Sequence, residues 1–196
     1  MKQFGFVILA VAALGASAPA AGQALTSAGY DFLDAVKKSD GGKATNLLDT
    51  HPKGLVNAKD NDGNTALIIA LNRSDEQWTG FLINKGADPN LGGKDGDTPL
   101  IVASRVGFEQ AVEWLISSGA KVDGTNRMGE TPLIVAVQQH QIPVVRVLLG
   151  QGADPDRTDH AAGYSARDYA LRDPRAREIL KMIQDKKPKA AASAAK

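Results

Sequence analysis

The residues that could do chemistry are few and far apart in this sequence. The three histidines, His51, His140 and His160, lack the paired spacing of metal ligands. The chain has no cysteine, so it offers neither a thiol nucleophile nor a disulfide. Ser165 stands in the segment GYSAR, which lacks the final glycine of a nucleophile elbow. We therefore predict no catalytic residue and no metal site.

Two glycine-containing segments match nucleotide-binding motifs only in part. Gly42 and Lys43 could end a phosphate-binding loop, but Lys37 stands where the first glycine of that loop should be. The segment GQGADP begins like a dinucleotide-binding motif and fails at Pro155. Carboxylates scattered in turns more often cap helices than catalyse. We predict no cofactor, and a hydrolase that uses aspartate or glutamate is a remote alternative.

A nine-residue phrase occurs three times, as DGNTALIIA, DGDTPLIVA and MGETPLIVA. Its threonines fall at positions 65, 98 and 131, a step of 33 residues. Glycines at 86, 119 and 152 keep the same step. A fixed period of this length indicates stacked supersecondary units, because one short unit cannot bury its apolar face alone.

The central unit predicts a pair of helices. Thr98 can cap the first helix, and Pro99 suits its first position, where the missing N–H has no cost. The helix should continue to Val106 and end at Gly107, which can adopt the left-handed conformation. A second helix is expected over residues 108–118. Its apolar residues recur at helical spacing, namely Ala111, Val112, Leu115 and Ile116.

The phrases GDTPLIVA, GETPLIVA, LINKGADPN and LLGQGADPD closely resemble the ankyrin repeat over about residues 26–183. The resemblance implies an all-α solenoid of stacked helix-turn-helix units joined by β-turn loops. It implies about five repeats, of which the first and last are degenerate caps: 26–58, 59–91, 92–124, 125–158 and 159–185. The family usually has a histidine where this chain has Ile68, Ile101 and Ile134, so a more apolar seam between repeats is expected.

Both ends of the chain are expected to lie outside the repeat domain, which we place at 25–185. Residues 1–24 combine Lys2, an apolar run and small residues, as a secretory signal peptide does. Cleavage after Ala20 and after Ala24 both fit. The alternative is a membrane anchor, which needs about 20 solidly apolar residues. The basic, alanine-rich residues 186–196 are predicted to be disordered.

The balance of charges and the absence of cysteine limit the expected cellular location of the protein and the classes of partner that it could bind. The chain has 23 basic and 22 acidic residues, and removal of Lys2 with the leader makes them equal. A general nucleic-acid binder needs an excess of positive charge, so we predict no nucleic-acid partner. No cysteine follows the leader to carry a lipid. We expect a monomer that is periplasmic or secreted, with no membrane insertion after signal cleavage.

In the proteins that this one resembles, turn tips and the exposed ends of the first helices line a concave surface that grips other proteins. The leading hypothesis is therefore a non-catalytic module, like exported bacterial ankyrin-repeat proteins, that binds another protein. The alternative, from resemblance alone, is a protective envelope protein in stress, including oxidative stress. We expect Arg73, Arg105 and Gln138 to form a row about 10 Å apart. The candidate partner-binding residues are Asn61, Asp62, Asn64, Asn72, Arg73, Lys94, Asp95, Asp97, Arg105, Val106, Arg127, Met128, Glu130, Gln138 and Gln139.

Overall fold

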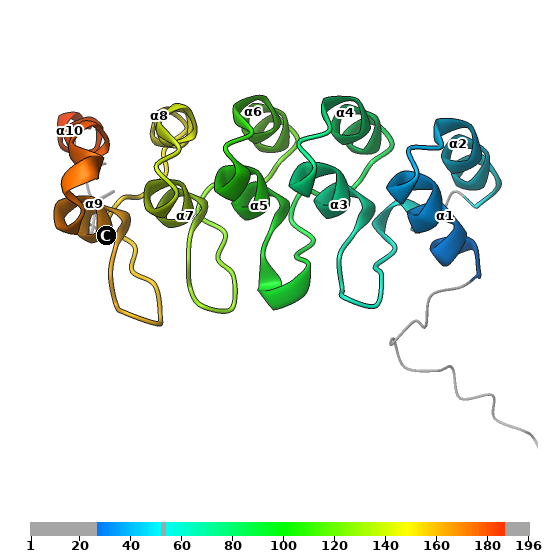
Figure 1. Ribbon diagram of the computed structural model, residues 1–196, viewed down its shortest axis with the longest axis horizontal. Helices are drawn as coiled ribbons and strands as arrows, with labels where there is room; N and C mark the ends of the chain where they lie inside the picture. Colours follow the sequence, from blue (N-terminus) through cyan, green and yellow to red (C-terminus); the bar gives the residue numbers. More distant parts are fainter. Residues whose placement is uncertain (1–26, 52–53, 187–196) are drawn as a thin grey trace, which may run out of the picture.

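The computed structural model describes residues 27–51 and 54–186, and this part of the chain forms ten α-helices in five pairs (Figure 1). The first helices of the pairs form one layer and the second helices form another, while long loops project from the layer of first helices. The predicted all-α solenoid of stacked helix pairs is confirmed. The predicted signal peptide, and all of the predicted tail except Lys186, lie outside the described residues.

In each pair the second helix runs back beside the first, and in the last four pairs the first helix is the shorter of the two. The pairs are α1 (Ser27–Lys37) with α2 (Gly41–Thr50), α3 (Ala66–Asn72) with α4 (Glu76–Asn84), α5 (Pro99–Val106) with α6 (Glu109–Ser117), α7 (Pro132–Gln138) with α8 (Ile142–Gly150), and α9 (Ala166–Arg172) with α10 (Arg177–Asp185). Short 3-10 helices cover Leu55–Asn57, Lys94–Gly96 and Pro174–Ala176. The second helix expected over 108–118 is thus one residue shorter at each end, because Phe108 and Ser118 are its cap residues.

Hydroxyl side chains begin four of the five first helices. Thr65, Thr98 and Thr131 each accept a hydrogen bond from the amide three residues later, at 3.3, 3.3 and 3.2 Å. Ser165 does the same for the amide of Asp168 at 3.2 Å, and the Asp168 carboxylate accepts from the Ser165 amide at 2.9 Å. This reciprocal capping satisfies two amides that the helix leaves free. Ser165 is therefore a capping residue of the last repeat.

The turn between the two helices contains a left-handed residue in each of the first four pairs. Gly107 adopts it with φ of 77°, as predicted. One period before and one period after, Ser74 and His140 adopt the same conformation with φ of 51° and 56°. This conformation is strained for residues that have a Cβ atom. The geometry of the stack therefore imposes this turn even where the sequence does not supply glycine.

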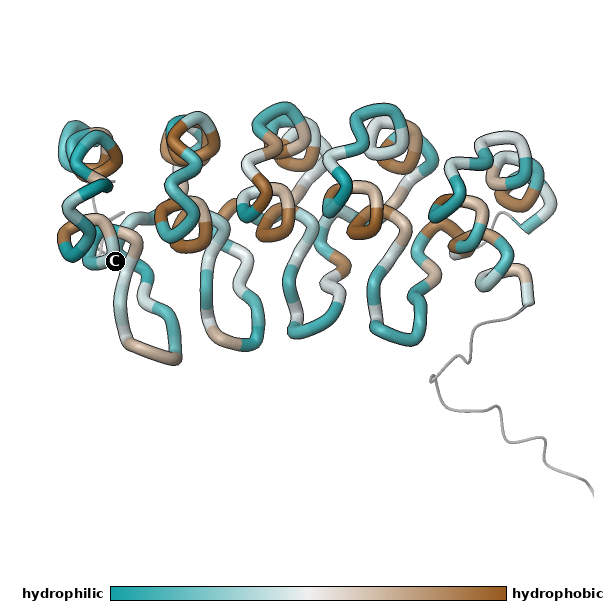
Figure 2. The backbone as a smooth tube through the Cα atoms, in the orientation of Figure 1, coloured by the Kyte–Doolittle hydropathy of each residue, from teal (hydrophilic) through white to brown (hydrophobic). Residues whose placement is uncertain are grey.

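The core is a continuous aliphatic seam between neighbouring helix pairs (Figure 2). The three isoleucines at the position of the family's histidine, Ile68, Ile101 and Ile134, are no more than 2% exposed. Their burial confirms the expected apolar seam. In the second helices, Leu82, Leu115 and Leu148 lie one period apart, and each is 0% exposed. Because each pair is covered by its neighbours, stability is shared along the stack.

A row of polar contacts joins the repeats at the loops that follow the second helices. A side-chain oxygen in one repeat accepts a hydrogen bond from a backbone amide of the next repeat, three times in succession. The acceptor and donor pairs are Asn57 with Asp88 (2.9 Å), Asn90 with Lys121 (2.9 Å) and Asp123 with Asp154 (3.0 Å). These bonds fix the spacing of the repeats.

In the part of the chain that the structure describes, no helix is long and apolar enough to cross a bilayer.

Candidate functional site

The loops that project from the layer of first helices end in four tips, at residues 60–64, 93–97, 126–130 and 159–164 (Figure 1). Two side chains build the first and third tips in the same way. Asp60 Oδ1 accepts from the amides two and four residues later at 3.1 and 2.9 Å. Asn126 Oδ1 accepts from the equivalent amides at 3.0 Å each. Such side-chain turns fix the tip backbone, so it need not be ordered when a ligand binds.

The second tip reaches a similar shape by a different route. Gly93 stands where the first tip has Asp60, one period earlier. A Cβ atom at Gly93 would lie 2.7 Å from Ile68 Cδ1 and 2.8 Å from Asn64 Oδ1, so a side chain there would displace both. The tip closes instead through the 3-10 turn Lys94–Gly96, with Asp95 at φ of 60°.

Backbone hydrogen bonds join neighbouring tips. The Arg127 amide donates to the Asp95 carbonyl at 3.0 Å, and the His160 amide donates to the Met128 carbonyl at 2.7 Å. The last three tips therefore form one braced strip, with the side chains of Arg127 and Met128 exposed on it. Met128 is 47% exposed, which is unusual for a large apolar side chain in this stack.

The candidate residues fall into two groups by exposure. Asn61, Asp62, Asn72, Arg73, Lys94, Asp95, Val106, Arg127, Met128 and Gln139 are exposed, whereas Asn64, Asp97, Arg105, Glu130 and Gln138 are partly buried. Together with the tips, the exposed ends of α3, α5 and α7 make up what we call the tip-and-helix surface.

Several of the partly buried candidates bond to one another across two repeats. Arg105 Nη1 donates to Asp97 Oδ2 at 2.6 Å, and Asn126 Nδ2 donates to Asp97 Oδ1 at 2.9 Å. Asn126 Nδ2 also donates to Glu130 Oε2 at 2.8 Å. This chain of contacts leaves Arg105 and Asp97 with internal partners. Their main contribution to a surface is to hold the second and third tips in register.

Models of two ankyrin families match the chain. One, described as ankyrin repeats (3 copies), matches residues 79–159, and the other, described as ankyrin repeat, matches residues 62–94. The two matches together span 62–159, which contains the second, third and fourth helix pairs and the whole of the second and third tips. This chain belongs to the ankyrin-repeat family. No curated protein matches it.

Ankyrin repeats are generally protein–protein interaction modules and are typically not enzymes. In this ankyrin-repeat protein, residues 27–51 and 54–186 contain no group of three or more histidine, aspartate and glutamate side chains placed to hold a metal ion. His140 Nε2 lies 2.7 Å from Asp173 Oδ2, one period away. That contact joins the turn after α7 to the last repeat.

The predicted row of Arg73, Arg105 and Gln138 is wrong in one member. The Arg73 guanidinium donates to the carbonyls of Val36 (3.1 Å) and Lys37 (3.3 Å) and to Ser39 Oγ (2.8 Å), so it ties the end of α1 to the second repeat. These bonds occupy the donors that a partner would need. Counted in steps of the 33-residue repeat, the residue that corresponds to Arg105 and Gln138 is Asn72.

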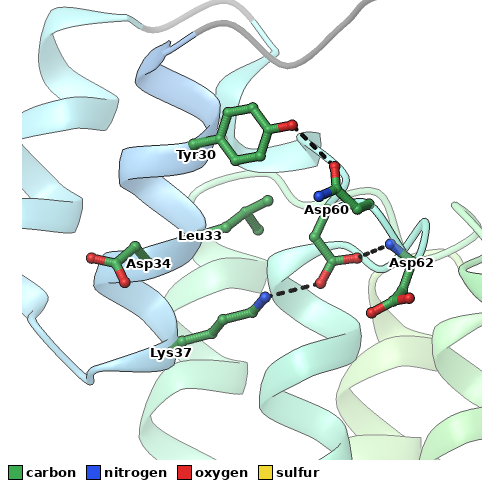
Figure 3. A pocket seen from close by; sticks show the side chains of 7 residues that line it. Tyr30, Leu33, Asp34, Lys37, Asp60 and Asp62 are labelled. Carbon is green, nitrogen blue, oxygen red and sulfur yellow. Dashed lines mark hydrogen bonds and ion pairs between the residues drawn. The ribbon is translucent and has the colours of Figure 1, made fainter.

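A hollow of about 360 Å³ lies at the first end of the ankyrin stack, between α1 and the first tip (Figure 3). Tyr30 and Lys37 reach from α1 toward the tip. Tyr30 Oη donates to Asn61 Oδ1 at 3.0 Å, and Lys37 Nζ donates to Asp60 Oδ2 at 3.1 Å. Sequence analysis missed Tyr30 and Lys37, because their part in the site depends on contacts more than 20 residues away.

The last ankyrin repeat is held by a buried carboxylate. Asp159 Oδ1 accepts from the amides of Ala162 (2.7 Å) and Gly163 (3.0 Å), and Tyr169 Oη donates to Asp159 Oδ2 at 2.6 Å. Burial opposes ionisation of Asp159, but the bonds from Tyr169 and the two amides outweigh it and lower the pKa of this carboxyl. Burial, together with the bond to Asp159, raises the pKa of Tyr169 to about 12.

These shifts predict a stability that depends on pH at both extremes. Between pH 10 and about 12 the tyrosine ionises only in the unfolded chain, so its contribution, about 1–2 kcal/mol after allowance for solvent, is lost as pH rises. The contribution of Asp159 is present above about pH 4 and is lost as pH falls below it. Urea unfolding of the wild type and of Tyr169→Phe at several pH values measures the alkaline loss. The loss should be smaller in Tyr169→Phe, and equal losses would contradict the assignment to this residue.

Proposed function

We propose that this ankyrin-repeat protein is a non-catalytic module that is exported to the periplasm or secreted and binds another protein through the tip-and-helix surface. The observation that carries the proposal is the braced strip of tips, on which Met128 and Arg127 are exposed. Methionine and arginine are enriched at protein interfaces. Because hydrogen bonds already fix the tips, binding would cost little ordering of the backbone.

Export is proposed from the sequence of residues 1–24, and a monomeric state from the degenerate first and last repeats, which would cap the ends of the stack. Removal of the leader leaves a chain that begins at Ala21 or Leu25, depending on the cleavage position. An intact-mass measurement on protein recovered from its native host separates these two products from the uncleaved chain. Recovery of only the uncleaved chain would contradict export by signal cleavage. The protective role in stress stays a prediction from resemblance.

Site-specific photo-crosslinking in the native host tests the binding surface. A photoreactive amino acid is placed at Met128 or Gln139 on the tip-and-helix surface, and in matched controls at Gln110 of α6 or Lys181 of α10. All four side chains are exposed, and the two control positions lie on second helices. We expect the first two positions to give a discrete crosslinked product whose partner is identified by mass spectrometry. Crosslinks from the control positions alone would place binding on the opposite layer.

A further inference from the structure

We propose that the hollow between α1 and the first tip is a subsite for a basic side chain, arginine or lysine, of the partner protein. This inference rests on the proposed function, and it adds the chemistry of one partner residue. The hollow lies beside the first tip, so a segment bound along the tip-and-helix surface would reach it (Figure 3).

One wall of the hollow is apolar and exposed. Tyr30 is 50% exposed, although the large apolar residues Phe32 and Leu33 of the same helix are almost fully buried. Its hydroxyl donates to Asn61 Oδ1, which fixes the direction of the ring. Leu33 lines the hollow beneath it. A fixed, exposed aromatic ring can pack on the aliphatic stem of a long side chain and can attract its cationic end.

The charges around the hollow are unbalanced. Lys37 pairs with Asp60 Oδ2 at 3.1 Å, and the other Asp60 oxygen accepts the two tip amides, so both charges are used internally. Asp62 has no hydrogen bond or ion pair to its carboxylate from the residues that the structure describes. Asp34 has an exposed pair with Lys38 at 2.9 Å, within its own helix. The lining thus holds three carboxylates and one ammonium group.

An arginine or lysine side chain complements each of these features. Its stem would pack on the ring of Tyr30, and its charge would be attracted to the carboxylate of Asp62. An acidic side chain would instead be repelled by the Asp62 carboxylate. The volume of about 360 Å³ is near the lower end of the range for ligand pockets, so the hollow suits one side chain of a bound segment.

The test uses acetyl-Gly-Arg-Gly-amide as the probe and the same peptide with citrulline as the neutral, nearly isosteric control. Titration is followed by two-dimensional NMR of the protein labelled with nitrogen-15. We expect the arginine peptide to cause saturable shifts at Asn61, Asp62 and the amides of α1, and the citrulline peptide to cause none. Equal shifts with both peptides, or no saturable shift with arginine, would overturn the proposal.

Two variants locate the effect. Asp62→Asn should weaken binding of the arginine peptide about two- to five-fold, as expected for the loss of one exposed ion pair. Asp95→Asn is the matched control, because Asp95 holds the same position in the next tip, one period later, and does not line the hollow. Circular dichroism checks that both variants fold. Equal weakening in both would reduce the effect to general electrostatics and would reject the subsite.

The outcome is separable from that of the proposed function. If the peptide titration fails while Met128 still crosslinks to a partner, the basic subsite is wrong and the binding surface stands. If Met128 and Gln139 give no crosslink while the arginine peptide saturates the hollow, the proposed partner-binding surface fails and the hollow stands as a site for cationic groups.

Discussion

Leu115→Ala is expected to lower the free energy of unfolding by about 2–5 kcal/mol, as for other buried leucines. Leu115 is 0% exposed in α6, which packs between α4 and α8 at the centre of the stack. Both neighbouring repeats cover it, so the surrounding helices can close the resulting cavity only in part. Repeats share their stability with their neighbours, so the loss should weaken the whole array rather than one repeat.

Urea unfolding followed by circular dichroism measures this loss, and the fluorescence of the two tryptophans, Trp114 in α6 and Trp78 in α4, reports the same transition. Glu113→Ala on the same helix is the matched control, since Glu113 is exposed and its replacement should change stability by less than about 0.5 kcal/mol. Similar, small effects of the two substitutions would mean that the seam between the second helices lies elsewhere.

Gly129→Ala is expected to cost about 2–5 kcal/mol, for two reasons that act together. Gly129 has φ of 77°, and that backbone conformation costs about 1–2 kcal/mol with a side chain present. In addition, the new Cβ atom would lie 2.6 Å from His160 Cδ2 and 2.9 Å from the His160 amide nitrogen. Relief of this overlap must move the next tip, at a further cost of about 1–3 kcal/mol.

Gly163→Ala separates the two contributions. Gly163 is the corresponding glycine of the last tip, has φ of 68°, and has no atom within 4 Å of the position of an added Cβ. It should therefore show only the backbone cost of about 1–2 kcal/mol. Urea unfolding of the two variants gives the comparison. If Gly163→Ala proves as costly as Gly129→Ala, the contact between the third and fourth tips contributes nothing to stability.

The fold could be predicted from the sequence because its signals are local. Thr65, Thr98 and Thr131 cap helices through bonds that span three residues. The period could also have corrected the predicted row, since Arg73 and Arg105 are 32 residues apart, one fewer than the repeat. The turn acceptor Asp60 was missed, although Asn126 and Asp159 occupy corresponding positions in later tips.

The sequence by itself determined the helix pairs of the three clear repeats, the threonines that cap their first helices and the aliphatic seam between them. These follow from hydrogen bonds and apolar spacing within a few turns of chain, which repeat every 33 residues. Only the tertiary structure decided which exposed polar side chains remain available to bind a partner. Arg73 is exposed, yet it is bound to α1, whereas the Asp62 carboxylate, which lines the hollow, has no partner among the residues that the structure describes. Such contacts join residues about one repeat apart, and stacking, which no single repeat contains, brings them together.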